Sequence, residues 1–194
     1  MTRTSRDTLV MNGINNHPHQ RAELDFYATE PKQVRLLLGI EDLSGARILE
    51  PCCGTGSIAQ VLPEAGLEVE ASDIADRGFG RQQDLFTIPS FDGHIVTNPP
   101  FTRAVDFVSH ALSIIPKGRK ACFFLKLTFL EGIKRRHFFD TTPPKRIHVS
   151  SGRAICAPNG DFASVKGSAI AYAWFVWEKG FRGKPTLDWY NPNP

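Results

Sequence analysis

A short apolar strand that runs into a glycine turn is the feature that most restricts the fold of this chain. Arg47-Ile48-Leu49-Glu50 has the length and composition of a buried strand, and Pro51-Cys52-Cys53-Gly54-Thr55-Gly56-Ser57 follows it directly. Apolar residues at helical spacing come next, at Ile58, Val61 and Leu62. The two glycines of the turn allow positive φ and a close approach of ligand to backbone. This pattern indicates a strand, a turn and a helix of an α/β protein.

Helix-like and strand-like segments alternate through the rest of the chain. Such alternation favours a mostly parallel sheet with helices on both faces. A Gly- and Arg-rich stretch at 76–81 leaves the second crossover helix short or absent. The predicted helices lie near 31–39, 57–65, 105–112 and 128–139, and the predicted strands near 47–51, 68–72, 93–97, 120–127, 146–149 and 169–177.

The tetrapeptide Asn98-Pro99-Pro100-Phe101 follows the apolar run 94–97 and carries the clearest chemical signal. The prolines hold Asn98 extended, so its side chain and the Pro99 carbonyl can both accept from one amino group. Phe101 can stack on a planar base or amide. Two acceptors would present the nitrogen lone pair to an electrophile without an ionisable base. The same residues also suit a plain Pro-Pro turn between a strand and a helix.

Two acidic residues stand where further ligand contacts are expected. Asp73 follows Ser72 at the end of the strand-like segment 67–71. A carboxylate at the carboxyl end of such a strand can hold the two hydroxyls of a ribose. Asp84 precedes Leu85 and Phe86, so it could accept from an adenine amino group while the apolar side chains flank the ring. A single surface Asp is usually just solvated, but here the elements follow one another in order.

Taken together, these motifs resemble the series found in S-adenosylmethionine-dependent amino-methyltransferases, and above all in adenine-specific DNA methyltransferases. Asp25-Phe26-Tyr27-Ala28-Thr29-Glu30-Pro31 is similar to the N-terminal motif of those enzymes. Leu130-Glu131-Gly132 and the segment 171–180 also resemble small phage and prophage methyltransferases that have no target recognition domain. The resemblance implies a Rossmann-like class I methyltransferase fold with helices on both faces of a mostly parallel seven-stranded sheet whose last strand is antiparallel.

The resemblance also assigns roles residue by residue, with S-adenosyl-L-methionine as cofactor and S-adenosyl-L-homocysteine as product. Asn98 and the Pro99 carbonyl would hold the target amino group, with Pro100 fixing the loop and Phe101 stacking on the base. Phe101 stands where the family more often has Tyr, and Glu50 where Asp is commoner, while Cys53 has no assigned role. The cofactor residues would be Asp25, Tyr27, Thr29, Glu50, Pro51, Cys52, Gly54, Gly56, Asp73, Asp84, Leu85 and Asn98.

Charge and cysteine content limit the partners. The net charge of +3 is only mildly basic, so clustering matters more than the total. Lys134, Arg135, Arg136 and the loop residue Arg153 could contact nucleic-acid phosphates, or could be solvated surface residues. The four cysteines lack the spacing of a zinc site, so no metal is expected. The polar N-terminus has no membrane or signal segment, which predicts a cytoplasmic protein.

Domain organisation is expected to be simple. We predict a flexible tail over 1–22, one methyltransferase catalytic domain over 23–190 and a short C-terminal tail over 191–194. The loop 151–168 is expected to be mobile near the substrate, and the aromatic run 172–177 to pack in the core. Nearly all residues after Phe101 are needed to finish the sheet, so we expect no recognition domain. Target choice would then depend on short loops, the tail, a specificity partner or another copy of the chain.

Three functions stay open at the level of sequence. The first is methylation of an exocyclic amino nitrogen of adenine in DNA. The second is methylation of RNA bases or of a protein glutamine, which also present an amino or amide nitrogen. The third is a non-catalytic cofactor-binding module that accompanies another methyltransferase.

Overall fold

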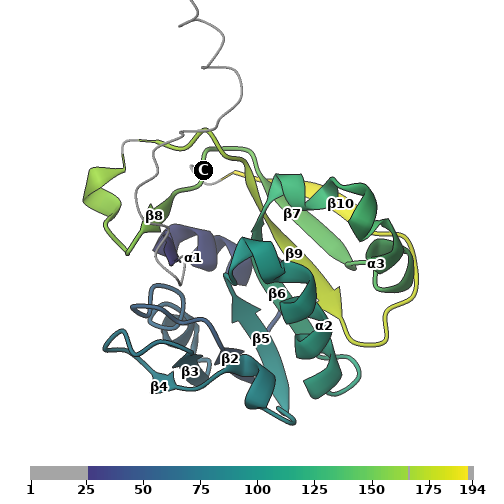
Figure 1. Ribbon diagram of the computed structural model, residues 1–194, viewed down its shortest axis with the longest axis horizontal. Helices are drawn as coiled ribbons and strands as arrows, with labels where there is room; N and C mark the ends of the chain where they lie inside the picture. Colours follow the sequence, from purple (N-terminus) through teal and green to yellow (C-terminus); the bar gives the residue numbers. More distant parts are fainter. Residues whose placement is uncertain (1–25, 166, 192–194) are drawn as a thin grey trace, which may run out of the picture.

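An eight-stranded sheet forms the centre of the computed structural model, which describes residues 26–165 and 167–191. The strand order is β10-β7-β9-β6-β5-β2-β3-β4 (Figure 1). β9 is antiparallel to both of its neighbours, and every other pair in the sheet is parallel. The strands are β2 (Arg47–Glu50), β3 (Val69–Asp73), β4 (Arg81–Gln82), β5 (Gly93–Thr97), β6 (Lys120–Lys126), β7 (Arg146–Ser150), β9 (Tyr172–Glu178) and β10 (Thr186–Tyr190).

The prediction of a mostly parallel sheet is confirmed, but the count of seven strands is wrong. β9 is the expected antiparallel strand, and it is not the last one. β10 adds an edge strand parallel to β7. Four of its five side chains are exposed, Leu187 and Trp189 among them, so this strand contributes little to the core.

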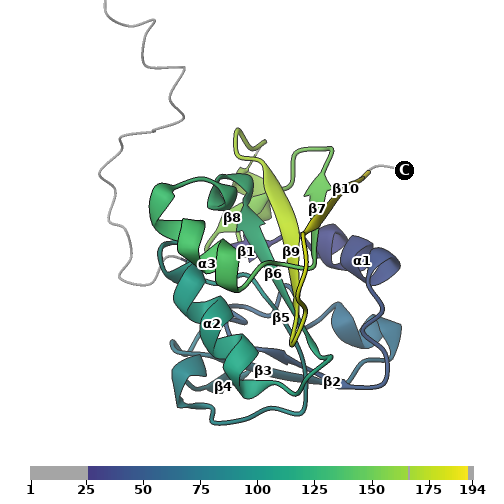
Figure 2. The ribbon, with the colours of Figure 1, turned by 90° about the vertical axis from the view of Figure 1, so that its right-hand side faces the viewer.

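Helices cover both faces of the sheet, as Figure 2 shows with α2 and α3 on one side and α1 on the other. These helices are α1 (Pro31–Ile40), α2 (Ala104–Ile114) and α3 (Arg136–Thr141). Side chains of β6 alternate between two cores. Phe123 packs in the cluster that contains α2 residues, and Phe124 in the cluster that contains α1 residues. The aromatic strand β9 alternates in the same way, so core packing is the right interpretation of its rings.

Two predicted helices do not form as continuous α-helices. The segment 57–65 contains turns and the 3₁₀ helix η1 (Leu62–Ala65), because Pro63 lacks the N–H that a continuing helix needs and Gly66 closes the turn at φ 75°. The segment 128–139 is divided by Gly132 at φ 102°. It contains η4 (Leu127–Leu130), η5 (Ile133–Arg135) and only the first part of α3.

A two-stranded antiparallel ribbon lies apart from the main sheet. It pairs β1 (Tyr27–Thr29) with β8 (Cys156–Pro158), which belongs to the long loop between β7 and β9. Two further 3₁₀ turns, η2 (Leu85–Thr87) and η3 (Phe101–Arg103), follow the acidic and the proline motifs, and η6 (Phe162–Ser164) lies in the long loop. The predicted N-terminal tail, Asp25 and residues 192–194 lie outside the described residues.

Candidate functional site

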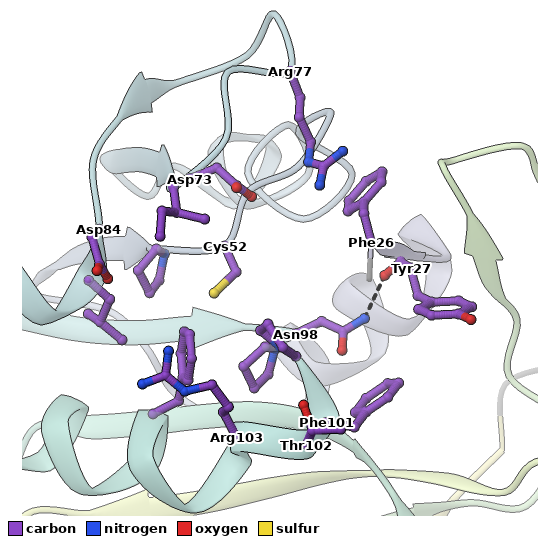
Figure 3. Close-up of a pocket in the computed structure, with 16 residues that line it drawn as sticks. Phe26, Tyr27, Cys52, Asp73, Arg77, Asp84, Asn98, Phe101, Thr102 and Arg103 are labelled. Carbon is purple, nitrogen blue, oxygen red and sulfur yellow. Dashed lines mark hydrogen bonds between the residues drawn. The ribbon is translucent and has the colours of Figure 1, made fainter. Parts of the chain in front are cut away.

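A cavity of about 460 Å³ opens at the carboxyl ends of β2, β3 and β5, where parallel α/β sheets bind ligands (Figure 3). Ten of the predicted site residues line it together. They are Tyr27, Pro51, Cys52, Asp73, Asp84, Leu85, Asn98, Pro99, Pro100 and Phe101. Of the other predicted residues, Thr29, Glu50, Gly54, Gly56, Lys134, Arg135, Arg136 and Arg153 do not line this cavity.

The side-chain amide of Asn98 is fixed by the β1–β8 ribbon. Its Nδ2 donates to the Tyr27 carbonyl at 2.8 Å and to Thr29 Oγ1 at 3.0 Å, and lies 3.9 Å from Cys156 Sγ. Its Oδ1 is buried and has no hydrogen-bond partner within the described part of the chain. Figure 3 shows the nitrogen end turned toward Tyr27 and the oxygen turned away from it. The arrangement leaves one oriented acceptor for an external N–H donor.

Phe101 lies among other aromatic and cationic side chains. Its ring centroid is 6.3 Å from that of Tyr27 and 6.1 Å from that of Tyr172. Lys126 Nζ lies 4.6 Å from the same centroid, within the range of a cation–π contact. These neighbours fix the ring at the start of η3.

Asp73 ends β3 and is held by two backbone donors. Its Oδ2 accepts from Gly54 N at 2.9 Å and its Oδ1 from Ala75 N at 3.0 Å. Asp73 is only 8% exposed, yet it lines the cavity. Lone pairs that these backbone bonds leave free can accept from ligand hydroxyl groups.

The two glycines of the turn face aromatic rings rather than the open cavity. Gly54 has φ 53°, and a Cβ there would lie 1.8 Å from the Phe26 ring. Gly56 has φ 89°, and its Cβ would lie 2.8 Å from the Phe79 ring. Their absent side chains therefore give room for Phe26 and Phe79 to cover the turn.

Glu50 is buried behind the cavity wall at 1% exposure, and its Oε2 has no partner among residues 26–165 and 167–191. Burial, assisted by the charge of Asp73, raises the pKa of the Glu50 carboxyl well above its usual range. Burial also raises the pKa of the Cys52 thiol well above normal and that of Cys53 to about 12. Cys53 Sγ donates to the Phe79 carbonyl at 3.3 Å, which gives this residue a structural contact.

The second acidic residue, Asp84, begins a short 3₁₀ turn next to the cavity. Asp84 Oδ1 caps η2 by accepting from Phe86 N at 3.0 Å, and the adjoining Leu85 is buried.

The sequence prediction missed six residues that line the cavity, namely Phe26, Ile74, Arg77, Thr102, Arg103 and Phe107. Their only local signal was proximity, since Ile74 follows Asp73 and Thr102 follows Phe101. Phe107 reaches the cavity from α2.

The predicted phosphate-binding residues differ in exposure and in their contacts. Arg136 pairs with Asp140 at 3.0 Å on the surface, Lys134 is exposed, and Arg153 is exposed with a long 3.5 Å contact to the Ala169 carbonyl. Arg135 turns inward and donates to the carbonyls of Thr128 and Glu131. These four residues do not form one rim around the cavity.

Neither a metal-binding cluster nor a membrane-spanning helix is found in the described residues. No group of three or more His, Cys, Asp or Glu side chains there could hold a metal ion. Nor does any helix in that part of the chain have the length and hydropathy needed to cross a bilayer.

Comparison with known proteins identifies the fold. No family model and no curated protein match the sequence. A solved structure assigned as the modification subunit of a type I restriction enzyme of Vibrio vulnificus is similar with a TM-score of 0.58 and 15% identity, over 86% of this chain and 47% of that one. This chain therefore spans about half the length of that subunit.

Two further solved structures agree. One is assigned as a class I S-adenosylmethionine-dependent methyltransferase of Listeria monocytogenes, with a TM-score of 0.56 and 13% identity over 84% of this chain and 64% of that one. The other is assigned as an RNA methyltransferase of Pyrococcus horikoshii, with a TM-score of 0.55 and 13% identity over 75% and 80%. At these identities the likeness shows a shared fold, which is that of class I methyltransferases.

Proposed function

We propose that this protein is an S-adenosylmethionine-dependent methyltransferase that acts on an exocyclic amino nitrogen, that of adenine in DNA. The observation that carries the proposal is the Asn98 amide. Both of its N–H groups have acceptors in β1, while its buried Oδ1 has no partner among the described residues. Leaving a buried acceptor unpaired costs about 1–3 kcal/mol, so a ligand N–H would relieve a real penalty.

The residues around the cavity fit the proposed cofactor. Asp73 would accept from the two ribose hydroxyls, Asp84 would accept from the adenine amino group, and Leu85 would flank the ring. The volume of about 460 Å³ falls within the roughly 300–1,000 Å³ of ordinary ligand pockets. Pro51 and Cys52 would line the methionine moiety, while Glu50, buried behind them with an unpartnered Oε2, would support this wall rather than touch the cofactor. When bound, the cofactor supplies an electrophilic methyl group.

The chain itself would supply positioning and hydrogen bonds. Asn98 Oδ1 and the Pro99 carbonyl would accept the two N–H bonds of the target amino group and aim its lone pair into the cavity. Phe101 would hold the ring to which that amino group belongs by stacking. No thiol near the cavity offers a base, because burial raises the pKa values of Cys52 and Cys53.

Adenine in DNA is the acceptor that the motif order and the N-terminal segment support. β1 belongs to that segment, and it contributes the contacts that orient Asn98. An RNA base or a protein glutamine would present a similar nitrogen to the same two acceptors, so the substrate class needs a direct test. We further propose that target choice relies on a specificity partner or a second copy of the chain.

Labelled methyl transfer to a cell lysate, followed by separate digestion with DNase, RNase or protease, distinguishes these acceptors. We expect the label to become soluble on DNase treatment. Calorimetry of cofactor binding runs in parallel. Tight cofactor binding without transfer to any polymer would contradict the proposal and identify a non-catalytic module.

A further inference from the structure

A second, smaller cavity adjoins the proposed acceptor site. It has a volume of about 70 Å³ and is bounded by residues from the start of α2, the end of β6 and the turns that follow. Phe101 lines both cavities, so they adjoin one another at this residue. The lining residues are Phe101, Ala104, Leu125, Lys126, Thr128, Phe129 and Arg135.

Two cations are fixed in the wall of this cavity. Lys126 Nζ lies 4.6 Å from the centroid of the Phe101 ring. The Arg135 guanidinium lies 5.2 Å from the Phe129 centroid, and its Nη2 donates to the Thr128 carbonyl at 3.0 Å. Arg135 Nε is buried and has no acceptor in the described part of the chain. Ring and backbone contacts therefore position both charges without neutralising them.

Among the described residues, no acidic side chain lines the cavity. Within residues 26–165 and 167–191, neither Lys126 nor Arg135 forms an ion pair, whereas Arg103 pairs with Asp106 and Arg136 with Asp140. The exposed Thr128, which carries a hydroxyl group, also lines the cavity. An ammonium, a guanidinium and a hydroxyl around a small space match an anion with several oxygens, such as a phosphate.

We infer that this cavity binds a backbone phosphate of the acceptor strand, with Lys126 as its principal cation. The inference rests on the proposed function, which places the acceptor base at Asn98 and Phe101. One sugar joins a base to its phosphate, so a base held at Phe101 places a phosphodiester close to the adjoining cavity. A protein glutamine carries no such anion, so the site assigns nucleic acid as the substrate class.

Anisotropy of a fluorescein-labelled single-stranded oligodeoxynucleotide tests the site without turnover. We expect Lys126→Gln to weaken binding about tenfold, as for a hydrogen bond to a charged group. The slope of log Kd against log salt should fall by about 0.7, the value for one phosphate contact on a single strand. Lys126→Arg should retain binding. Lys117→Gln makes the same charge change beyond the opposite end of β6 and should behave as wild type.

Unchanged affinity and salt slope in Lys126→Gln, with a wild-type melting temperature, would overturn the inference. A labelled RNA strand provides the second arm, and tighter binding to RNA with the same loss in Lys126→Gln supports the phosphate site while revising the acceptor. The cofactor dissociation constant should stay unchanged in the variant. Absence of methyl transfer by the wild-type protein would instead refute the proposed function, which separates the two failures.

Discussion

At the scale of single residues, the orientation of one amide decides what the site can do. An asparagine side chain can present either its oxygen or its NH₂ group, and exchanging the two atoms would turn an acceptor into a donor. Thr29 and the Tyr27 carbonyl settle that choice in favour of Oδ1. The sequence predicted Asn98 itself from its neighbours, but the partners lie 69 and 71 residues away, and no local pattern could reveal them.

Thr29→Val should lower kcat while leaving cofactor affinity near the wild-type value. The valine keeps the shape but removes the acceptor, so Asn98 is less firmly oriented, and one neutral hydrogen bond of about 1 kcal/mol corresponds to about fivefold. Thr29→Ser keeps the hydroxyl acceptor and should retain the wild-type kcat. Thr186→Val on β10 makes the same substitution away from the site and should also leave kcat unchanged. The measurement is steady-state kinetics with calorimetry of the cofactor. A loss confined to cofactor affinity would show that Thr29 acts on the cofactor instead.

Glu50→Gln should stabilise the protein at alkaline pH. The unfolded carboxyl loses its proton near its ordinary pKa of 4.5, whereas the folded one holds it to a higher pH. The free energy of unfolding of the wild type therefore falls as the pH rises from the unfolded pKa to the folded pKa of Glu50. The neutral amide of Glu50→Gln avoids this loss. Thermal melting should show no gain near pH 4 and a gain at pH 8, by about 3 °C for each kcal/mol recovered. An equal difference at both pH values would contradict this account.

At the scale of elements, a buried carboxylate ties α1 to the sheet. Glu41 follows α1 and accepts from Lys120 Nζ at 2.8 Å, from Arg146 Nη2 at 2.7 Å and from His148 Nε2 at 2.8 Å. Burial opposes its ionisation, but the hydrogen bonds from His148, Arg146 and Lys120 hold the pKa of Glu41 well below its usual range. The helix is thereby fixed to the first residues of β6 and β7.

Glu41→Gln should cost about 3 kcal/mol of unfolding free energy at neutral pH, because it leaves the partly buried Lys120 and Arg146 without their counter-charge. Urea unfolding measures this, with Glu178→Gln as the control. That residue forms a more exposed pair with Lys145 and should cost under about 1 kcal/mol. The difference in unfolding free energy between wild type and Glu41→Gln should shrink as the pH falls below 4.5. The pKa of Glu41 is lower in the folded protein than in the unfolded chain, so its stabilisation is complete only above the unfolded pKa and is lost as the carboxylate becomes protonated. Equal costs for the two variants would refute the role of Glu41.

Most strands were predictable because their apolar runs are local. The continuous apolar runs 120–127 and 93–97 are typical of buried strands. Parallel neighbouring strands place their carboxyl ends at the same edge of the sheet. The ribbon β1–β8, the edge strand β10 and the loss of helix over 57–65 were not predictable in this way. Each depends on a distant pairing or on the backbone limits of Pro63 and Gly66. Mobility of the loop 151–168 stays a prediction.

At the scale of the whole molecule, the proposed chemistry is complete, whereas few described elements could read a sequence. Residues 120–190 largely finish the sheet, so the substrate-facing parts are the ribbon, the short turns and the small cationic cavity. Extruding a base from a duplex costs a few kcal/mol. We therefore expect methyl transfer to single-stranded DNA at least as fast as to a duplex of the same sequence. A clear preference for duplex in initial-rate assays would contradict this expectation.

We propose above all that Asn98 presents an acceptor to an amino group of adenine in DNA. The most direct test is mass spectrometry of nucleosides from DNA and RNA incubated with S-adenosylmethionine and either the wild-type protein or Asn98→Ala. We expect N6-methyladenine in DNA for the wild type and none for the variant, with cofactor binding retained in both. Equal methylation by the two proteins, or no methylated nucleoside from a wild-type protein that binds the cofactor, would contradict it.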